Sequence, residues 1–209
     1  MNERKIPMQL IGLFDSPYVR RVAVSMRLQG FGFEHVALSV FRNQDEMRKL
    51  NPLVKVPMLV LDNGEKLIES SFILDYLDDI ASAGKRLVPA SGEERRRVLQ
   101  QCAIALIGTE KAVQILYDTK LRPAEKTHAP WVERCKQQMH DAFGLMETQP
   151  ASPVLSGAPI TQADITSTVA LAFAKYVHPA EFPAGCYPRL EQLSAFCEGL
   201  PAFIETPME

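Results

Sequence analysis

The sequence lacks the paired cysteines, clustered histidines and catalytic signatures that mark several common classes of enzyme. No C-x-x-C pair occurs, and the histidines have no metal-ligand spacing. G-x-S-x-G, H-E-x-x-H and Gly-rich phosphate-loop motifs are also absent. We therefore predict neither a metal site nor a serine triad. The cysteines are expected to be buried thiols of a reducing compartment, which favours the cytoplasm; they are Cys102, Cys135, Cys186 and Cys197.

The sequence also has little net charge and no long apolar run. Its formal net charge is −2, which gives no broad electrostatic case for binding nucleic acid. No stretch of 18 apolar residues exists, so we expect no membrane-spanning helix. The first seven residues carry charge but no apolar core, and we expect no secretory signal there. The 209 residues are 46% hydrophobic and suffice for one large or two small globular domains.

The first 81 residues alternate between strand and helix patterns. Apolar periodicity and turn residues predict the order strand, helix, strand, helix, strand, strand, helix over 8–13, 17–30, 33–40, 43–50, 56–61, 67–68 and 70–81. The first two strands, joined by a helix, should be parallel. Asn63-Gly64 predicts a tight hairpin turn between the last two strands. Ser70 or Ser71 is expected to cap the last of these helices.

The pattern breaks at a turn-rich stretch, and every element after it is predicted to be helical. The expected domains are residues 1–83, a linker over 84–91 and an all-helical domain over 92–209. Long helices are predicted over 93–120 and 124–148, shorter ones follow Thr161 and Pro188, and the tail is predicted to be irregular. Their expected inward-facing residues are Leu99, Cys102, Leu106, Val113 and Leu116 on the first helix, and Trp131, Cys135, Met139, Ala142, Phe143 and Met146 on the second.

Residues 55–71 hold the most informative local sequence. A strand, a turn and a second strand lead directly into Glu69, Ser70 and a helix, whose N-terminus can hold a carboxylate ligand with its N–H groups and dipole. Pro57 opens the first of these strands, where a proline is tolerated. The residues alone favour an ordinary trans bond before Pro57, because about 5% of X–Pro bonds in folded proteins are cis.

Ser16 is the hydroxyl best placed for chemistry, between a strand and a helix that begins at Pro17. A thiolate placed there would be stabilised by the hydroxyl donor and by the helix dipole. The alternative is that Ser16 only caps its own helix. Arg20 and Arg21 lie in the first helical turns, where cations oppose the dipole. A nearby anionic ligand or simple placement on the surface would explain them.

Four local matches, in this order and spacing, resemble the cytosolic glutathione transferases over nearly the whole chain. The run from Ser16 to Val22 is similar to the family's first-helix motif, and Asn51-Pro52 followed by Lys55-Val56-Pro57 resembles its N-P-x-x-x-V-P, whose last proline is cis. Glu69-Ser70 resembles its E-S pair, and residues 161–164 resemble its S/T-x-A-D capping box. The resemblance implies an α/β plus all-α fold: a thioredoxin-like β-α-β-α-β-β-α domain followed by an all-helical domain.

The resemblance also implies a glutathione site. Ser16 would donate a hydrogen bond to the sulfur of glutathione, as in serine-type classes such as zeta. Val56, shaped by cis Pro57, would pair its backbone with the cysteinyl unit. Glu69 would meet the γ-glutamyl ammonium, and Ser70 its carboxylate. The remaining candidates are Lys55 for glutathione and, for an apolar acceptor pocket beside the Phe14 loop, Ile104, Gly108 and Lys111.

Glutathione is therefore expected as co-substrate, a small hydrophobic electrophile as second substrate, and a homodimer as the assembly. The chain departs from the family in two places. Zeta-type members carry Ser-Ser-Cys where this chain has 16–18, and omega-like members carry cysteine where it has Ser16, which argues against thiol-transferase chemistry at that position. A non-catalytic interaction protein of the stringent-starvation type, and a glutathione-dependent isomerase or dehalogenase, are the alternatives that these motifs leave open.

Overall fold

The computed structural model describes residues 8–208, which form two compact units. The first unit comprises the described residues up to Leu87 and those from Pro201 onward, and the second is Val88–Leu200. The first unit contains β1 (Met8–Ile11), α1 (Pro17–Gln29), β2 (Phe33–Val36), α2 (Gln44–Leu50), β3 (Met58–Val60), β4 (Lys66–Ile68), α3 (Ser70–Ile80) and α8 (Pro201–Ile204).

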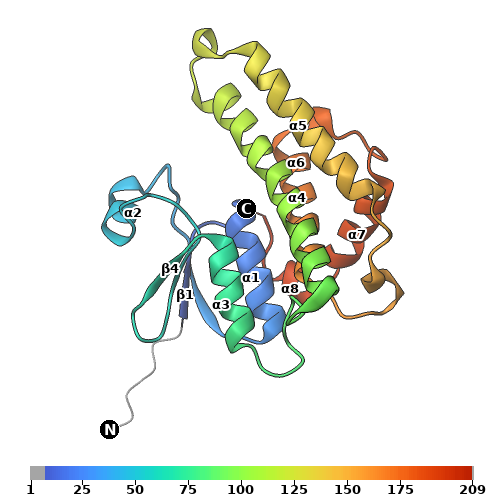
Figure 1. The fold of residues 1–209 in the computed structure, drawn as a ribbon. Coiled ribbons are helices and arrows are strands. Elements are labelled where there is room, and N and C mark those ends of the chain that lie inside the picture. Colours follow the sequence, from blue (N-terminus) through green and yellow to red (C-terminus); the bar gives the residue numbers. More distant parts are fainter. Residues whose placement is uncertain (1–7, 209) are drawn as a thin grey trace. The chain divides into compact units, whose positions relative to one another are not determined.

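The strands of the first unit form one mixed sheet in the order β2-β1-β3-β4 (Figure 1). β1 and β2 are parallel, with Met8 opposite Phe33, while β3 is antiparallel to both β1 and β4. This sheet, with its helices, confirms the predicted thioredoxin-like order.

Helices cover both faces of the sheet. Neighbouring residues of a strand point to opposite faces, so one strand can contact the helices on either side. Leu10 of β1 packs with residues of α1 and α3, whereas Ile11 packs with Met47 of α2. Figure 1 shows α1 and α3 side by side on one side of the strands and α2 on the other. Apolar packing on both faces explains why β3 is a continuous apolar run rather than an alternating pattern.

Two strands are shorter than predicted because the backbone turns. β2 ends at Val36, whose carbonyl accepts a hydrogen bond from the Leu38 N–H at 2.9 Å. This three-residue turn removes the rest of the predicted strand from the ladder. β1 ends at Ile11 because Gly12 has φ +130°, a conformation almost restricted to glycine.

The hairpin loop is longer than the predicted two-residue turn. The Leu61 N–H donates to the Glu65 carbonyl at 2.8 Å, and the Gly64 N–H donates to the Leu61 carbonyl at 2.9 Å. The loop therefore has three residues, 62–64, and ends on Gly64 with φ +84°. A turn followed by a left-handed glycine is the usual geometry of a three-residue hairpin loop.

The prediction of an irregular tail is wrong. The short helix α8 forms there and packs against α1 within the first unit. Phe203 of α8 is buried, and the Arg20 guanidinium lies over its ring at 5.7 Å from the centroid. Arg20 Nε also donates to the Thr206 carbonyl at 2.7 Å. The single turn of α8 was too short to show a helical period in the sequence.

The second unit is helical throughout. It contains α4 (Gly92–Leu116), a π-helical turn η1 (Tyr117–Leu121), a 3₁₀ turn η2 (Ala124–Lys126), α5 (Ala129–Thr148), a 3₁₀ turn η3 (Pro153–Ser156), α6 (Gln162–Val177), a 3₁₀ turn η4 (Pro179–Glu181) and α7 (Pro188–Glu198). α5 starts later than predicted, with Pro130 in its first turn, where a proline costs no hydrogen bond.

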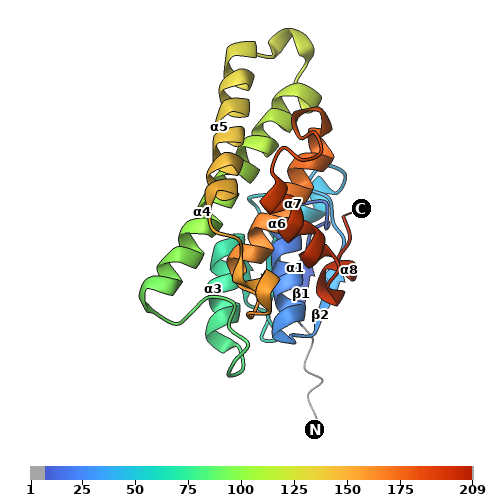
Figure 2. The ribbon, with the colours of Figure 1, turned by 90° about the vertical axis from the view of Figure 1, so that its right-hand side faces the viewer.

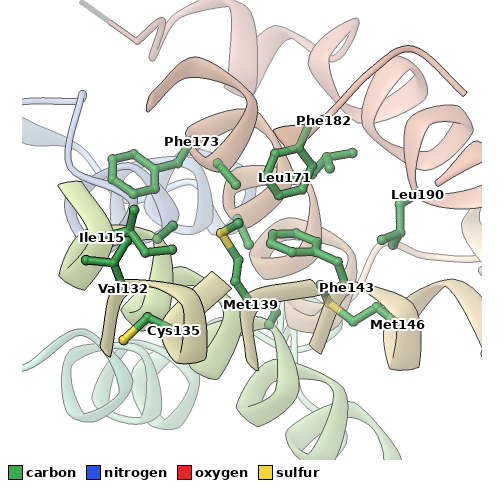
Figure 3. Packing of buried hydrophobic residues seen from close by; sticks show 14 residues of the cluster. Ile115, Val132, Cys135, Met139, Phe143, Met146, Leu171, Phe173, Phe182 and Leu190 are labelled. Carbon is green, nitrogen blue, oxygen red and sulfur yellow. The ribbon is translucent and has the colours of Figure 1, made fainter. Parts of the chain in front are cut away.

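α4 packs against both α5 and α6, and Figure 2 shows the long α4 and α5 side by side. Their shared core is built from Phe143, Met139 and Leu171, among others, and is drawn in Figure 3. The prediction that Leu99 and Trp131 face the core is wrong, since Leu99 is 43% exposed and Trp131 is 42% exposed.

Small residues make up much of the buried face of α4, between the larger Val98 and Ile115. Ala105, Gly108 and Ala112 are buried there. A Cβ added at Gly108 would lie 3.3 Å from Cβ of Ala142 and 3.3 Å from the Phe143 ring. Gly108 therefore belongs to the close contact between α4 and α5.

A half-buried polar cluster fastens the connection between α6 and α7 to α5. Lys136 Nζ donates to Glu181 Oε1 at 2.5 Å, and His140 Nε2 lies 3.2 Å from Glu181 Oε2. The hydrogen bond from Lys136 holds the pKa of the Glu181 carboxyl below its usual range. Tyr187 Oη lies 2.9 Å from His140 Nδ1, and burial raises the pKa of this phenol. The cluster therefore serves as a structural clamp rather than as a source of a reactive phenolate.

Residues 161–164 form the predicted capping box at the start of α6. Asp164 Oδ2 accepts hydrogen bonds from the Thr161 N–H at 2.8 Å and from the Thr161 hydroxyl at 2.7 Å. Asp164 Oδ1 also accepts from the Ser152 hydroxyl in the preceding loop. None of the helices described within residues 8–208 combines the length and apolarity needed to cross a membrane.

Candidate functional site

Ser16 is the N-cap of α1 and is partly exposed. Its Oγ accepts a long hydrogen bond of 3.4 Å from the Val19 N–H, while its carbonyl accepts from the Arg20 N–H at 2.9 Å. A serine hydroxyl has one proton and two acceptor positions. Because the cap uses Oγ as an acceptor, the hydroxyl proton can still be donated outward. Capping and donation to a ligand are therefore compatible in this geometry.

Gly12 brings the start of α1 next to the loop before β3. A Cβ placed on Gly12 would lie 2.5 Å from Val19 Cγ2 and 2.9 Å from Val56 Cβ. Side chains do not approach this closely, so the chain passes here only as glycine. The close approach sets the position of the Val56 loop against β1 and α1.

The loop that carries Val56 is held from within by Asn51. This buried side chain donates to the Lys55 carbonyl at 2.9 Å and accepts from the Leu53 N–H at 3.1 Å. Val54 has φ +49°, and the bond between Val56 and Pro57 is cis. The cis bond agrees with the family motif and not with the trans bond that base rates favour. Lys55 itself is exposed, and the structure fixes its carbonyl rather than its ammonium group.

Val56 lies outside the sheet ladder, two residues before Met58, the first residue of β3 that pairs with β1. Pro57 is buried and Val56 is partly exposed. This arrangement leaves a short backbone segment at the end of the sheet that is outside the hydrogen-bond ladder. Such a segment can pair with an extended ligand in the way that a further strand would.

Glu69, and not either serine, is the N-cap of α3. Its carboxylate accepts from the Ser71 N–H at 3.1 Å and from the Phe72 N–H at 3.3 Å. Its backbone φ of +71° is rare for a residue with a side chain. Ser70 is 2% exposed, and its hydroxyl lies 3.4 Å from Glu69 Oε1. A carboxylate, a hydroxyl and a helix N-terminus thus meet at one point, as the sequence predicted.

Arg20 and Arg21 are buried, so the surface explanation for them is wrong. Arg20 points toward α8, as described above. Arg21 points toward α3, where Nη1 donates to Ser70 Oγ at 3.1 Å and lies 3.4 Å from Ser71 Oγ. Arg21 therefore joins the helix that begins at Ser16 to the helix that begins at Ser70.

The loop between β1 and α1 is fixed by an aromatic stack. The ring centroids of Phe14 and His35 lie 3.8 Å apart, and the angle between the ring planes is 7°. His35 Nε2 lies 2.7 Å from the Gly12 carbonyl oxygen. His35 belongs to β2, the strand paired with β1. This contact holds both ends of the loop that leads to Ser16.

The cysteines lie outside this site, in the second unit, and none is disulfide-bonded. Cys102, Cys135 and Cys197 are buried, whereas Cys186 is partly exposed. Burial raises the pKa of the Cys197 thiol to about 11 and raises the pKa of Cys135 and of Cys186. A thiol with a raised pKa is a poor nucleophile. Within residues 8–208 no group of three or more histidine, cysteine or acidic side chains is arranged to hold a metal ion.

The site therefore joins Ser16, Val56 and Ser70 through two connections that sequence reasoning missed. Gly12 lies between Val19 of the helix that Ser16 caps and Val56, and Arg21 joins the same helix to Ser70. A glycine directly after a strand was the signal for the first connection. Two cations in the early turns of a helix were the signal for the second, but no local pattern distinguishes a nearby ligand from the protein surface as the reason for them.

A family model for the N-terminal domain of glutathione S-transferase matches residues 10–86, which include all of these site positions. Residues 10–86 therefore belong to the glutathione S-transferase family, in agreement with the resemblance of the sequence to the cytosolic glutathione transferases. Among curated glutathione transferase relatives, the uncharacterized GST-like protein YibF of Escherichia coli is 24% identical over 87% of this chain and 88% of its own length. Glutathione S-transferase U8 of Arabidopsis thaliana is 31% identical over 42% of this chain and 39% of its own length.

A solved structure from the glutathione transferase family covers almost the whole chain. A family member from Pseudomonas fluorescens Pf-5, crystallised with bound glutathione, is 28% identical and superimposes with a TM-score of 0.86. The alignment covers 97% of this chain and 99% of that protein. The alignment therefore includes residues of both the first and the second unit.

Proposed function

We propose that the protein is a glutathione transferase of the serine type, in which Ser16 stabilises the thiolate of glutathione. The observation that carries this proposal is the partly exposed Ser16 hydroxyl, whose oxygen accepts from the Val19 N–H and whose proton remains available. The glutathione bound to the Pseudomonas fluorescens family member supports the choice of ligand. The proposal assigns no ionisation to Ser16 itself.

The chemistry needs a thiolate at neutral pH. A free thiol has a pKa of about 8.5, so about 3% is ionised at pH 7, and each unit by which the pKa is lowered corresponds to ~1.36 kcal/mol. The thiol proton leaves to solvent, and the hydroxyl of Ser16 and the dipole of α1 stabilise the anion that remains. The sulfur then forms a bond to an electrophilic carbon, whose leaving group or π bond takes up the displaced electron pair.

The other candidate residues supply the binding frame. Val56 is proposed to pair its backbone with the cysteinyl unit, with Pro57 shaping the loop. Glu69 is proposed to contact the γ-glutamyl ammonium and Ser70 its carboxylate. Lys55, which is exposed, is proposed as an additional contact to the peptide. The grouping of Glu69 and Ser70 at the N-terminus of α3 supports these roles.

We further propose a small apolar electrophile as acceptor, a role in detoxification, a homodimer, and a cytoplasmic location without nucleic-acid or membrane partners. The homodimer is proposed from the resemblance of the sequence to the cytosolic glutathione transferases. The subclass within the superfamily remains the zeta-like prediction.

Replacing Glu69 with glutamine is expected to weaken glutathione binding about tenfold or more, because the contact with the ligand ammonium loses its charge. Glutamine keeps an oxygen that can cap α3. Calorimetric titration of the wild-type and variant proteins with reduced glutathione measures the effect. The Glu65→Gln variant, in the exposed hairpin loop, is the matched control and should bind as the wild type does.

Equal binding by the wild-type protein and the Glu69→Gln variant would contradict the proposed position of the ligand. The absence of binding at millimolar glutathione would favour the interaction-protein alternative. If glutathione binds but is returned unchanged after turnover, the isomerase alternative is correct instead, and analysis of the products for a glutathione conjugate distinguishes the two.

The Ser16→Ala variant is expected to raise the thiol pKa of bound glutathione by about one to two units and to slow conjugation at pH 7 about 10- to 100-fold. The affinity for glutathione should change much less, since the binding frame is intact. The ultraviolet absorbance of the thiolate over a pH titration measures the pKa directly. Ser16→Thr, which keeps the hydroxyl, is the control. A pKa left unchanged by Ser16→Ala would rule out this role.

A further inference from the structure

Arg21 occupies an unusual position for a cation. It lies in the early turns of α1, where the helix dipole opposes a positive charge, yet it is 3% exposed. Arginine is almost never buried unless it is paired, because desolvation of the guanidinium is costly. A buried arginine at this place therefore indicates that its contacts have a specific purpose.

The contacts of Arg21 lead directly to the first turn of α3. Nη1 lies 3.1 Å from Ser70 Oγ and 3.4 Å from Ser71 Oγ, and it donates to both. Ser70 is itself 2% exposed. Ser70 is also the residue proposed to hold the γ-glutamyl carboxylate. Arg21 thus lies behind a ligand-binding hydroxyl rather than in front of the ligand.

The direction of the hydrogen bonds follows from the chemistry of the two groups. Arginine can only donate, and it stays protonated at all accessible pH values. When Arg21 donates to Ser70 Oγ, the single proton of Ser70 must be directed elsewhere. In the structure this proton is donated to Glu69 Oε1 across 3.4 Å. A ligand carboxylate at the N-terminus of α3 can take the place of this long contact.

We propose that Arg21 is a positioning residue for the carboxylate of the γ-glutamyl group: it fixes the Ser70 hydroxyl as a hydrogen-bond donor and adds a positive charge behind it. The inference rests on the proposed glutathione site. It gives each of the two charges of the γ-glutamyl group its own partner in the protein. The Glu69 carboxylate faces the ammonium, whereas the Ser70 hydroxyl, positioned by Arg21, binds the carboxylate.

Arginine suits this task better than lysine would. Its planar fork can donate to two neighbouring hydroxyls while it keeps a fixed orientation, whereas an ammonium is a point charge on a flexible stem. Arg20 provides an internal comparison on the same helix. It is equally buried, but it donates to the Thr206 carbonyl and lies over the Phe203 ring, away from α3.

The test compares two peptides on four proteins. The peptides are glutathione and γ-aminobutyryl-cysteinyl-glycine, which lacks only the α-carboxylate of the γ-glutamyl group. The proteins are the wild type, Arg21→Gln, Arg21→Lys and the control Arg20→Gln. Titration calorimetry gives the ratio of the two affinities, and circular dichroism shows that each variant is folded.

Arg21→Gln is expected to weaken the binding of glutathione about tenfold or more, while the affinity for the decarboxylated peptide changes less than about threefold. The ratio of the affinity for glutathione to that for the decarboxylated peptide therefore falls. Arg21→Lys keeps the charge and more of the buried packing, so its affinity ratio should lie between those of the wild type and Arg21→Gln. It replaces Arg21→Gln in the test if the glutamine variant fails to fold. Arg20→Gln should leave the ratio as in the wild type. A purely structural role would weaken both peptides equally and leave the ratio unchanged.

An unchanged ratio in both Arg21 variants would overturn the inference while leaving the glutathione site intact. If the wild-type protein binds neither peptide, the proposed function and the inference fall together. If Arg20→Gln lowers the ratio as much as Arg21→Gln, the effect comes from the loss of any buried cation in α1, and the assignment to Arg21 is wrong.

Discussion

The Gly12→Ala variant is expected to lose about 3 kcal/mol or more of unfolding free energy. Two costs add at this position. A residue with a side chain at φ +130° is strained by about 1–3 kcal/mol. Inserting a methyl group into a packed contact costs a further ~1–3 kcal/mol, and the new Cβ would lie 2.5 Å from Val19 Cγ2. Chemical denaturation of both proteins measures the loss.

The same substitution should weaken glutathione binding in the fraction that stays folded. The added Cβ would also lie 2.9 Å from Val56 Cβ, and the backbone of Val56 is the one proposed to pair with the ligand. The easiest relief is to move the Val56 loop away from β1. Titration calorimetry under native conditions should therefore show a higher dissociation constant.

Gly64→Ala is the matched control for Gly12→Ala. Gly64 has φ +84°, so it carries a similar conformational strain, but a Cβ there would meet no atom within 4 Å. It should cost about 1 kcal/mol and leave glutathione binding unchanged. Equal losses in the two variants would mean that the contact at Gly12 relaxes freely, and the structural importance assigned to it would be wrong.

The Asp164→Ala variant is expected to lose about 3 kcal/mol of unfolding free energy without a change in glutathione affinity. The carboxylate is 5% exposed and accepts hydrogen bonds from the Thr161 N–H, the Thr161 hydroxyl and the Ser152 hydroxyl. Loss of a helix cap costs about 1 kcal/mol, and each buried donor left without an acceptor costs ~1–3 kcal/mol. Thermal and chemical denaturation measure the loss.

Ser152→Ala removes one of the three donors to Asp164 and provides a graded control. It should cost about 1 kcal/mol, since the carboxylate keeps its two bonds to Thr161. A loss in Asp164→Ala no larger than in Ser152→Ala would show that the capping box adds nothing to the stability of α6. A large change in glutathione affinity would contradict the placement of Asp164 outside the ligand site.

Local patterns in the sequence were sufficient for the order of the elements. Apolar spacing and turn residues predicted the β-α-β-α-β-β-α order, and Thr161 with Asp164 predicted the start of α6. These features depend on residues three or four positions apart, which the sequence shows directly. The local pattern failed where one hydrogen bond ended an element early, as at Val36.

The buried faces of the long helices were harder to predict, because several faces of α4 carry apolar residues. The sequence analysis placed Leu99 and Leu106 on the inward face by their spacing, but Leu99 is exposed and the structure buries Ala105 and Ala112. Small residues allow α4 to approach α5 and α6 closely, and the partner helices, not the size of the side chain, decide which face is covered.

The sequence by itself indicated the family and the order of the elements, and it placed Ser16 directly before the first helix. The structure moved the cap of α3 from a serine to Glu69 and placed Val56 outside the sheet ladder. The tertiary structure alone decided what connects these residues. Arg21 and Ser70 are separated by 49 positions along the chain. No local pattern encodes a contact over such a separation, because it depends on how α1 and α3 pack on one face of the sheet. The same tertiary structure decided that Arg20 and Arg21, for which the sequence left both a ligand and the surface open, are buried donors.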